Sequence, residues 1–211
     1  QRPPEVVPQI VSGDLTEELL AAFLAGPDLA VDTETMGLDP RRDRLCLVQL
    51  SSGDGHAHLV RIARGQTSAP NLERMLSDPK VLKLFHFGRF DIAALKTAFV
   101  TAPFYCTKIA SKMVRTFTDR HGLKYLLTDL LGVDISKQQQ TSDWGAEKLT
   151  EAQAEYAASD VLYLHRLKAE LDARLAREGR TGLAQACFDF LPTRAMLDLS
   201  GWEGETDIFN H

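Results

Sequence analysis

The stretch Leu29-Ala30-Val31-Asp32-Thr33-Glu34-Thr35-Met36-Gly37-Leu38 decides the fold and places two carboxylates close together. Its apolar start predicts a buried strand. Side chains two residues apart on a strand point to the same face, so Asp32 and Glu34 should project together from the strand's end. Two such carboxylates repel each other unless a cation lies between them, and the absence of Cys and His here favours Mg²⁺ or Mn²⁺. A strand followed by an acidic turn would give the same pattern, so further ligands must come from elsewhere.

The composition is that of an ordinary globular chain. Its 211 residues, 44% hydrophobic and 25% charged, can bury about 70% of the unfolded surface in one domain. Three widely spaced cysteines indicate neither a disulfide framework nor a thiolate zinc site. The formal charge of −5 argues against a broadly basic nucleic-acid binder. We see no signal peptide and no apolar run approaching about 18 residues, so we expect no membrane span and a cytoplasmic location.

Strand and helix signals alternate in the first half of the chain. Apolar runs predict strands at 45–50, 58–62 and 81–86, and the turn residues 52–55 join the first two as a hairpin. The strand ending at Glu34 and the strands at 45–50 and 58–62 should form an antiparallel meander. Helices are expected near 14–24, where Asp14 and Glu17 are spaced as a capping box, and at 71–76 and 88–99. This alternation favours an α/β sheet.

The second half of the chain is predicted to be helical. Helices are expected at 108–117 and 122–131, followed by a polar loop at 136–146 and one long helix from about 150 to 178. We expect one domain over 1–187. The tail 188–211, with Trp202 and Phe209 among acids, cannot form a core alone.

The long helix carries a second pair of reactive groups. Tyr156 and Asp160 are four residues apart and therefore share one helix face. A half-buried Tyr beside a solvated Asp would look the same, and Asp91, in the first turn of its helix, is expected there from the helix dipole alone. The five residues together are a stronger signal than any one of them. A two-metal site in one α/β domain is assembled from carboxylates, here four with a Tyr, that stand on separate elements.

The order Asp32-x-Glu34, His86-x4-Asp91 and Tyr156-x3-Asp160 resembles the DEDD superfamily of 3′-5′ exonucleases, in the tyrosine branch that contains ribonuclease D. The resemblance covers roughly 28–175 and includes the stretches 45–50, 86–91, 141–144 and 156–164. It implies a ribonuclease H-like (DnaQ-like) exonuclease fold, a mixed central sheet flanked by helices. The chain ends at residue 211, which we expect leaves no room for the helical nucleic-acid-binding domains of ribonuclease D.

The stretches 118–123, 136–140 and 199–203 resemble nanoRNase C, a bacterial family that degrades very short RNA and above all diribonucleotides. Its members form ring-shaped homo-octamers, so the resemblance implies a homo-oligomer with short RNA, and possibly DNA, as substrate. The tail 188–211 would then lie in subunit contacts.

The resemblance implies that Asp32, Glu34, Asp91 and Asp160 hold two divalent cations, Mg²⁺ or Mn²⁺, and that Tyr156 lies beside the attacking water. Two such ions lower the pKa of a bound water and stabilise the departing 3′-oxygen. A Tyr with a pKa near about 10 is a poor base at neutral pH, so its hydroxyl is assigned to orienting that water.

Six residues are candidates for substrate binding, each with a plainer alternative. Leu38 resembles an apolar wedge against the terminal bases, or is a core residue. Lys108 and Lys112, with Arg115 at the next helical position and Arg120 and Lys124 beyond it, form a basic stretch that holds phosphates or is a solvated face. His86 and Arg89 contact a phosphate or serve packing. Trp144 stacks on a base or anchors its loop.

Three other functions remain open. The chain could be a ribonuclease D-like exonuclease on longer RNA or DNA. It could be a non-catalytic nucleic-acid-binding module, although none of the four carboxylates is missing. It could be a magnesium phosphotransferase with Asp32 as the nucleophile, which leaves Asp91, Tyr156 and Asp160 without a role.

Overall fold

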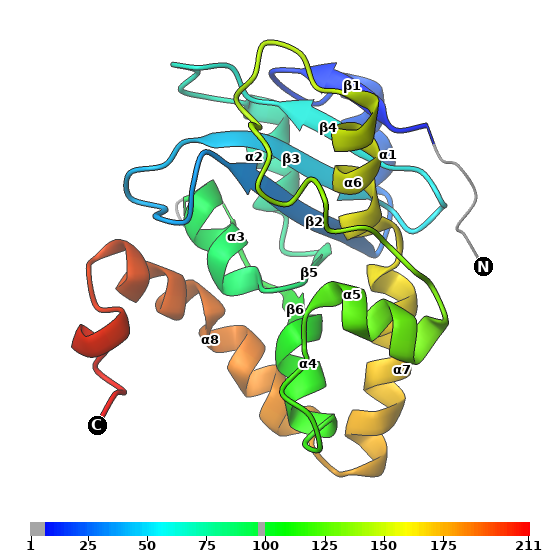
Figure 1. Ribbon diagram of the computed structural model, residues 1–211, viewed down its shortest axis with the longest axis vertical. Coiled ribbons are helices and arrows are strands. Elements are labelled where there is room, and N and C mark those ends of the chain that lie inside the picture. Colours follow the sequence, from blue (N-terminus) through cyan, green and yellow to red (C-terminus); the bar gives the residue numbers. More distant parts are fainter. Residues whose placement is uncertain (1–6, 97–99) are drawn as a thin grey trace.

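The computed structural model describes residues 7–96 and 100–211. It contains a mixed sheet of six strands in the order β1-β4-β3-β2-β5-β6, with helices on both faces. In Figure 1, α6 lies in front of the strands and α1 and α2 lie behind them, while α4, α5, α7 and α8 gather beside β6. The strands are β1 (Gln9–Ser12), β2 (Asp28–Thr35), β3 (Leu45–Ser51), β4 (His58–Arg61), β5 (Leu82–Phe85) and β6 (Phe104–Cys106).

The described helices follow the same order along the chain. They are α1 (Glu17–Leu24), α2 (Pro70–Leu76), α3 (Gly88–Leu95), α4 (Thr107–Val114), α5 (Leu123–Leu126), the π-helix η1 (Leu127–Leu131), α6 (Glu151–Leu162), α7 (Leu164–Arg177), α8 (Thr181–Leu199) and the 3₁₀-helix η2 (Gly204–Thr206). None of the helices within residues 7–96 and 100–211 combines the length and apolar character needed to cross a membrane. The predicted helix 88–99 corresponds to α3, and its residues 97–99 lie outside the described part.

The predicted meander is confirmed, since β2, β3 and β4 pair antiparallel in sequence order. On its other side β2 pairs parallel with β5, but only from Asp28 to Ala30. From Val31 onward β2 has β3 as a partner and no register with β5. Residues 31–35 of β2 therefore extend beyond its pairing with β5, and the two acidic side chains stand on this part of the strand. The edge strands β1 and β6 were not predicted.

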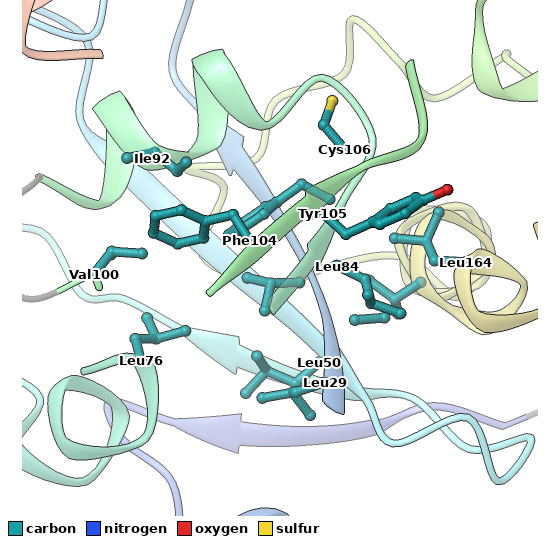
Figure 2. Packing of buried hydrophobic residues seen from close by; sticks show 14 of the residues in the cluster. Leu29, Leu50, Leu76, Leu84, Ile92, Val100, Phe104, Tyr105, Cys106 and Leu164 are labelled. Carbon is teal, nitrogen blue, oxygen red and sulfur yellow. The ribbon is translucent and has the colours of Figure 1, made fainter. Parts of the chain in front are cut away.

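Buried side chains fill both faces of the sheet. Leu29, Leu50 and Leu84 are fully buried within the larger cluster, where Figure 2 shows them packed with Phe104 and Leu164. A smaller cluster lies under α6 and contains Leu47, Leu59, Trp144, Ala154 and Ala157. Since residues two apart share a face, the α6 side of β3 also receives Gln49, a polar residue in an apolar strand.

The prediction of one long helix at 150–178 is wrong, because the helix is interrupted at Tyr163 (φ −118°, ψ 0°). The α6 segment buries a stripe of small residues against the sheet. The α7 segment buries Leu164, Leu167, Leu171 and Leu175, and it packs against α4. A straight helix would not direct both stripes at the core. The Ser159 hydroxyl also donates to the Tyr156 carbonyl, a contact that often bends helices.

The predicted capping box of Asp14 and Glu17 is also wrong. Thr16 caps α1 by accepting from the Leu19 amide at 3.2 Å. The Asp14 carboxylate instead accepts from the amides of Asn71 and Leu72, at 2.9 and 2.8 Å, in the first turn of α2. It therefore accepts hydrogen bonds from the first amides of α2, which have no partner within their own helix.

The expected boundary between residues 187 and 188 falls inside α8. Phe188, Leu191 and Ala195 are buried in the main cluster, and the Phe188 ring centroid lies 4.6 Å from that of Tyr105. Helix α8 therefore belongs to the core through Ala195. Beyond α8 the described chain contains only the short η2.

Candidate active site

Three carboxylates meet where β2 runs past the end of β5. Asp32 and Glu34 come from β2 and Asp160 comes from α6, and one oxygen from each lies within 4.8 Å of the others. Asp91, from the first turn of α3, is buried beside them, and its Oδ1 accepts a 2.5 Å hydrogen bond from the Thr33 hydroxyl. The structure thus brings together the four acids that the motifs predicted, each on an element anchored in the core.

Burial makes this cluster unfavourable when all its members are ionised. Desolvation raises the pKa of Asp32 to about 6. Desolvation and the Asp32 charge raise that of Glu34 to about 9. The pKa values of Asp91 and Asp160 lie well above the ordinary range for the same two reasons. A bound divalent cation would reverse the balance by pairing with the charges, and an all-oxygen donor set is what Mg²⁺ and Mn²⁺ prefer.

Gln49 belongs to this cluster but was missed in the sequence. Its Nε2 donates to Asp32 Oδ2 at 3.0 Å and to Glu34 Oε1 at 3.3 Å. The side chain is fully buried, and these contacts hold the two carboxylates in position while lowering both pKa values. The available signal was one amide in the otherwise apolar run 45–50.

Tyr156 lies one helical turn before Asp160 on α6, facing the same site. Burial, and then the charge of Asp160, raises the pKa of the phenol, so the hydroxyl stays protonated near neutral pH. Its ring centroid lies 5.9 Å from that of Trp144. Tyr156 can therefore hold a water molecule by a hydrogen bond but cannot supply a phenolate base.

A cavity of about 580 Å³ opens over the carboxylates. The loop after β2 lines one part of the cavity, the N-terminal ends of α3 and α4 line another, and the start of α5 and the loop around 135–144 complete the lining. Its lining includes Met36, Leu38, His86, Phe87, Phe90, Lys108, Lys124, Lys137, Gln140, Trp144 and Tyr156.

The structure separates the alternatives for Leu38 and Trp144. The Leu38 side chain lines the cavity and is 88% exposed, which excludes a core role. Trp144 is 3% exposed and packs in the cluster under α6, so it anchors its loop and offers little ring surface for stacking.

His86 and Lys108 also line the cavity, with different charges. The His86 Nδ1 lies 2.8 Å from the Thr107 hydroxyl, and burial lowers the pKa of the ring to about 3. A neutral imidazole supplies no positive charge to a phosphate. The Lys108 Nζ lies 4.1 Å from the centroid of the Phe87 ring, and Lys108 and Lys124 are the members of the predicted basic stretch that line the cavity. Lys137, at the rim, was not predicted.

Three predicted basic residues lie elsewhere. The Arg89 guanidinium forms two bonds to Asp198, at 2.6 and 2.7 Å, and does not line the cavity. Lys112 lines a neighbouring depression of about 460 Å³ between α4 and α8. Arg115 is 3% exposed and pairs with Asp129 at 2.6 Å, so the basic face expected on this helix is not continuous.

Comparison with known proteins identifies the fold and the family. Residues 9–176 match a model described as 3′-5′ exonuclease. Ribonuclease D of Acidiphilium cryptum is 39% identical over 184 residues, which is 85% of this chain and 46% of that protein. This chain spans about half the length of the curated relatives it matches. The crystal structure of Escherichia coli RNase D, an exoribonuclease involved in structured RNA processing, is 28% identical with a TM-score of 0.76, covering 89% of this chain and 50% of that one.

A shorter protein matches over nearly its whole length. Brucella melitensis NrnC with bound Mg²⁺ is 55% identical, with a TM-score of 0.90 and coverage of 98% of this chain and 100% of that one. The same protein bound to pGG is 56% identical, with a TM-score of 0.91 and the same coverage. The predicted ribonuclease H-like exonuclease fold is confirmed. This chain therefore belongs to the family of 3′-5′ exonucleases, in its ribonuclease D-like branch and close to NrnC.

Proposed function

We propose that this chain is a metal-dependent 3′-5′ exoribonuclease that hydrolyses short oligoribonucleotides, above all diribonucleotides, to nucleoside 5′-monophosphates. The observation that carries the proposal is the placement of four carboxylates and Tyr156 at the base of one bounded cavity. At about 580 Å³ its volume falls in the range of small-molecule sites, roughly 300–1,000 Å³. The structure of NrnC with pGG supports a short ligand for this group of proteins.

In the proposed reaction, Asp32, Glu34, Asp91 and Asp160 hold two divalent cations. When bound, such a pair lowers the pKa of a coordinated water and neutralises charge that develops on the departing 3′-oxygen. Gln49 and Thr33 fix the orientation of the carboxylates by the hydrogen bonds they donate. The Tyr156 hydroxyl orients the attacking water, because its raised pKa keeps the proton in place.

The cavity walls supply the groups for substrate recognition. Exposed Leu38 would pack against the terminal bases, with Phe87 on the opposite wall. Lys108 would meet a phosphate oxygen. Recognition would thus be concentrated on the two terminal nucleotides, with few cations to hold a longer strand.

The other candidate functions explain less of the site. A phosphotransferase using Asp32 would leave Asp91, Tyr156 and Asp160 unused, although the fold brings all three beside it. A non-catalytic binding module has no need of four buried acids that destabilise one another. Activity on longer RNA or DNA remains the second candidate, and the similarity to ribonuclease D favours it.

The test is a comparison of kcat/KM for end-labelled RNA and DNA of 2, 3, 7 and 20 nucleotides, with Mg²⁺ or Mn²⁺ at two salt concentrations. We expect dinucleotides to be cleaved at least as efficiently as longer RNA, with a weak dependence on salt. Chelation, or Asp160→Asn, should abolish cleavage. A steady rise of kcat/KM with length, steeper at low salt, would replace the dinucleotide preference with ribonuclease D-like activity. No cleavage of any substrate would refute the enzyme assignment.

We also propose that the chain forms a closed homo-oligomer, by resemblance a homo-octamer. Exposed apolar side chains gather in the C-terminal region, a pattern typical of interaction surfaces. They are Met196, Trp202, Ile208 and Phe209, with Phe190 in contact with Phe209 at 5.6 Å between ring centroids.

A further inference from the structure

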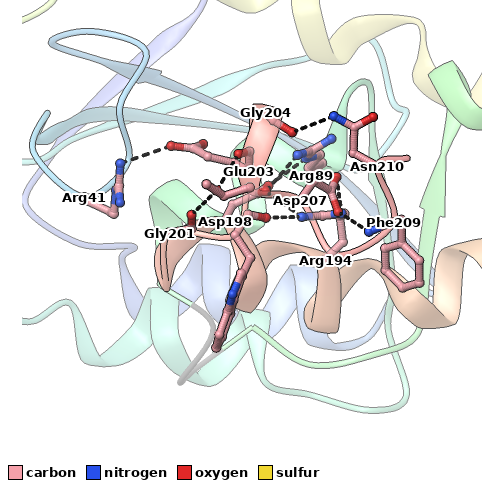
Figure 3. A network of polar contacts seen from close by, with 12 residues as sticks. Arg41, Arg89, Arg194, Asp198, Gly201, Glu203, Gly204, Asp207, Phe209 and Asn210 are labelled. Carbon is pink, nitrogen blue, oxygen red and sulfur yellow. Dashed lines mark hydrogen bonds and ion pairs between the residues drawn. The ribbon is translucent and has the colours of Figure 1, made fainter.

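The end of α8 is tied to the helix that carries Asp91. Asp198 accepts from Arg89 Nε at 2.6 Å and from Arg89 Nη2 at 2.7 Å, a two-point contact between α8 and the first turn of α3. Arg194 Nη2 also donates to Asp198 at 3.2 Å. Figure 3 shows Asp198 between the two guanidinium groups. Arg89 precedes Asp91 by two residues, so this contact bears on the part of α3 from which the Asp91 carboxylate enters the site.

The segment after α8 is folded back against the same centre. Arg194 donates from Nη1 to Asp207 Oδ2 at 2.8 Å and from Nη2 to the Trp202 carbonyl at 2.6 Å. These bonds fix the position of the residues between, including Glu203. The Glu203 carboxylate then reaches Arg41 Nη2 at 3.0 Å, as Figure 3 shows. Arg41 lies in the loop between β2 and β3, three residues from Leu38.

We propose that Asp198 and Glu203 are positioning residues of the active site, with Asp198 holding Asp91 through Arg89 and Glu203 holding Leu38 through Arg41. This inference rests on the proposed function and deepens it. It assigns the C-terminal segment a role within the subunit, separate from any role in assembly. Neither residue touches the substrate, and each acts on one component of the cavity.

The two contacts differ in strength because they differ in burial. The Asp198 side chain is 9% exposed, and it is shared by two guanidinium groups, so the loss of its charge leaves Arg89 without a partner at the α3–α8 junction. The Arg41 and Glu203 side chains are 45% and 41% exposed, where an ion pair contributes little. The loop has other support, since Lys96 Nζ donates to the Pro40 carbonyl at 2.8 Å. The first contact should therefore matter more than the second.

Metal affinity tests the contact with α3 without requiring turnover. Mn²⁺ binding to the metal-free full chain is followed by the electron paramagnetic resonance signal of free Mn²⁺. Asp198→Asn should raise the Mn²⁺ Kd about 3- to 10-fold. Arg89→Gln, which leaves Asp198 paired with Arg194 and so preserves folding, should raise it by a similar factor. The double variant should be no weaker than the weaker single one, because both changes remove the same contact.

The contact with the Leu38 loop is tested by KM at saturating metal. Glu203→Gln and Arg41→Gln should each raise KM for a diribonucleotide about 2- to 5-fold, leave kcat unchanged, and not add in the double variant. Glu205→Gln is the matched control, because this exposed glutamate in η2 forms no ion pair within the described residues. It should change neither quantity.

The outcomes separate this inference from the function on which it rests. Absence of both Mn²⁺ binding and cleavage in the parent protein would refute the proposed function. A parent protein that binds and cleaves, with Mn²⁺ Kd unchanged in Asp198→Asn and in Arg89→Gln, would refute the positioning of Asp91. A raised KM in Arg89→Gln with unchanged Mn²⁺ Kd would instead make Arg89 a substrate contact. Equal KM in Glu203→Gln, Glu205→Gln and the parent would refute the positioning of Leu38.

Discussion

Replacing Glu34 by Gln should stabilise the metal-free protein while destroying its metal site. The Glu34 carboxyl has a pKa of about 9 in the folded chain against 4.5 as a model group. At pH 7 the unfolded chain carries an ionised Glu34 and the folded chain a protonated one. Folding must therefore take up a proton at a pH where protons are scarce, which costs about 3 kcal/mol at roughly 1.4 kcal/mol per pH unit.

Glutamine has nearly the same size and no charge, and its carbonyl can still accept from Gln49. We expect the free energy of unfolding in EDTA at pH 7 to rise by about 2–3 kcal/mol. In a chain of this size that corresponds to a rise in Tm of roughly 4–12 °C. Because the folded state binds the extra proton only between the two pKa values, the parent loses stability as pH rises from 4.5 towards 9. The advantage of the variant should shrink to below about 1 kcal/mol at pH 5.

The assay is thermal unfolding followed by circular dichroism at pH 5, 7 and 9, with EDTA and then with excess Mg²⁺. Mg²⁺ should raise the Tm of the parent and have little effect on Glu34→Gln. Glu155→Gln, at an exposed position on α6, is the matched control and should leave Tm unchanged. A variant no more stable than the parent in EDTA at pH 7, or one whose advantage grows at pH 5, would show that this carboxyl is not held neutral by burial.

Four further predictions follow from the structure. Tyr156→Phe should lower kcat roughly 10²-fold with little change in substrate binding, and equal turnover would remove the hydroxyl from the mechanism. Leu38→Ala should raise KM for dinucleotides without changing Tm, whereas Phe117→Ala, equally exposed but outside the cavity, should change neither. Lys83 is fully buried, which lowers its pKa from 10.5 to about 8. Between those pKa values the unfolded chain binds more protons than the folded chain, so the free energy of unfolding of the parent should rise with pH. Lys83→Met should raise the free energy of unfolding at pH 7 by at most about 3 kcal/mol and should not show this rise with pH. Denaturant titrations at several pH values measure both effects. Light scattering at micromolar concentration should give the mass of an oligomer, and the mass of a single chain, about 23 kDa, would contradict this prediction. Phe209→Ser should weaken the assembly.

Much of the fold could be predicted from the sequence where segments are long and periodic. The strand leading to Asp32 and the meander after it are framed by apolar runs and a glycine-rich turn, so local pattern and final pairing agree. The edge strands β1 and β6, of 4 and 3 residues, are too short to show a period. The break at Tyr163 has no proline or glycine to mark it, because it follows from the different directions in which α6 and α7 meet the core.

The acids of the site could be predicted because their spacing along the sequence indicates which of them lie on the same face of a strand or helix. The partners of Arg89 and Arg115 could not, since a cation on a helix looks the same in sequence whether it meets solvent, phosphate or a distant carboxylate. Asp198 lies 109 residues from Arg89. Burial decides these cases, and it is set by how α3, α4 and α8 pack.

The pairing of β2 with β5 is short, and the cavity beyond it is built from two kinds of segment that can change at different rates in evolution. The reacting groups stand on β2, α3 and α6, whose backbones are fixed by the core, while Leu38 and Lys137 stand on connections between elements. Substitutions and insertions in those connections can therefore reshape the mouth of the cavity without moving the carboxylates. Selection for a new substrate length or sugar would find its successful variants in the loops 36–44 and 132–144. The chemistry could stay constant while the substrate range diversifies.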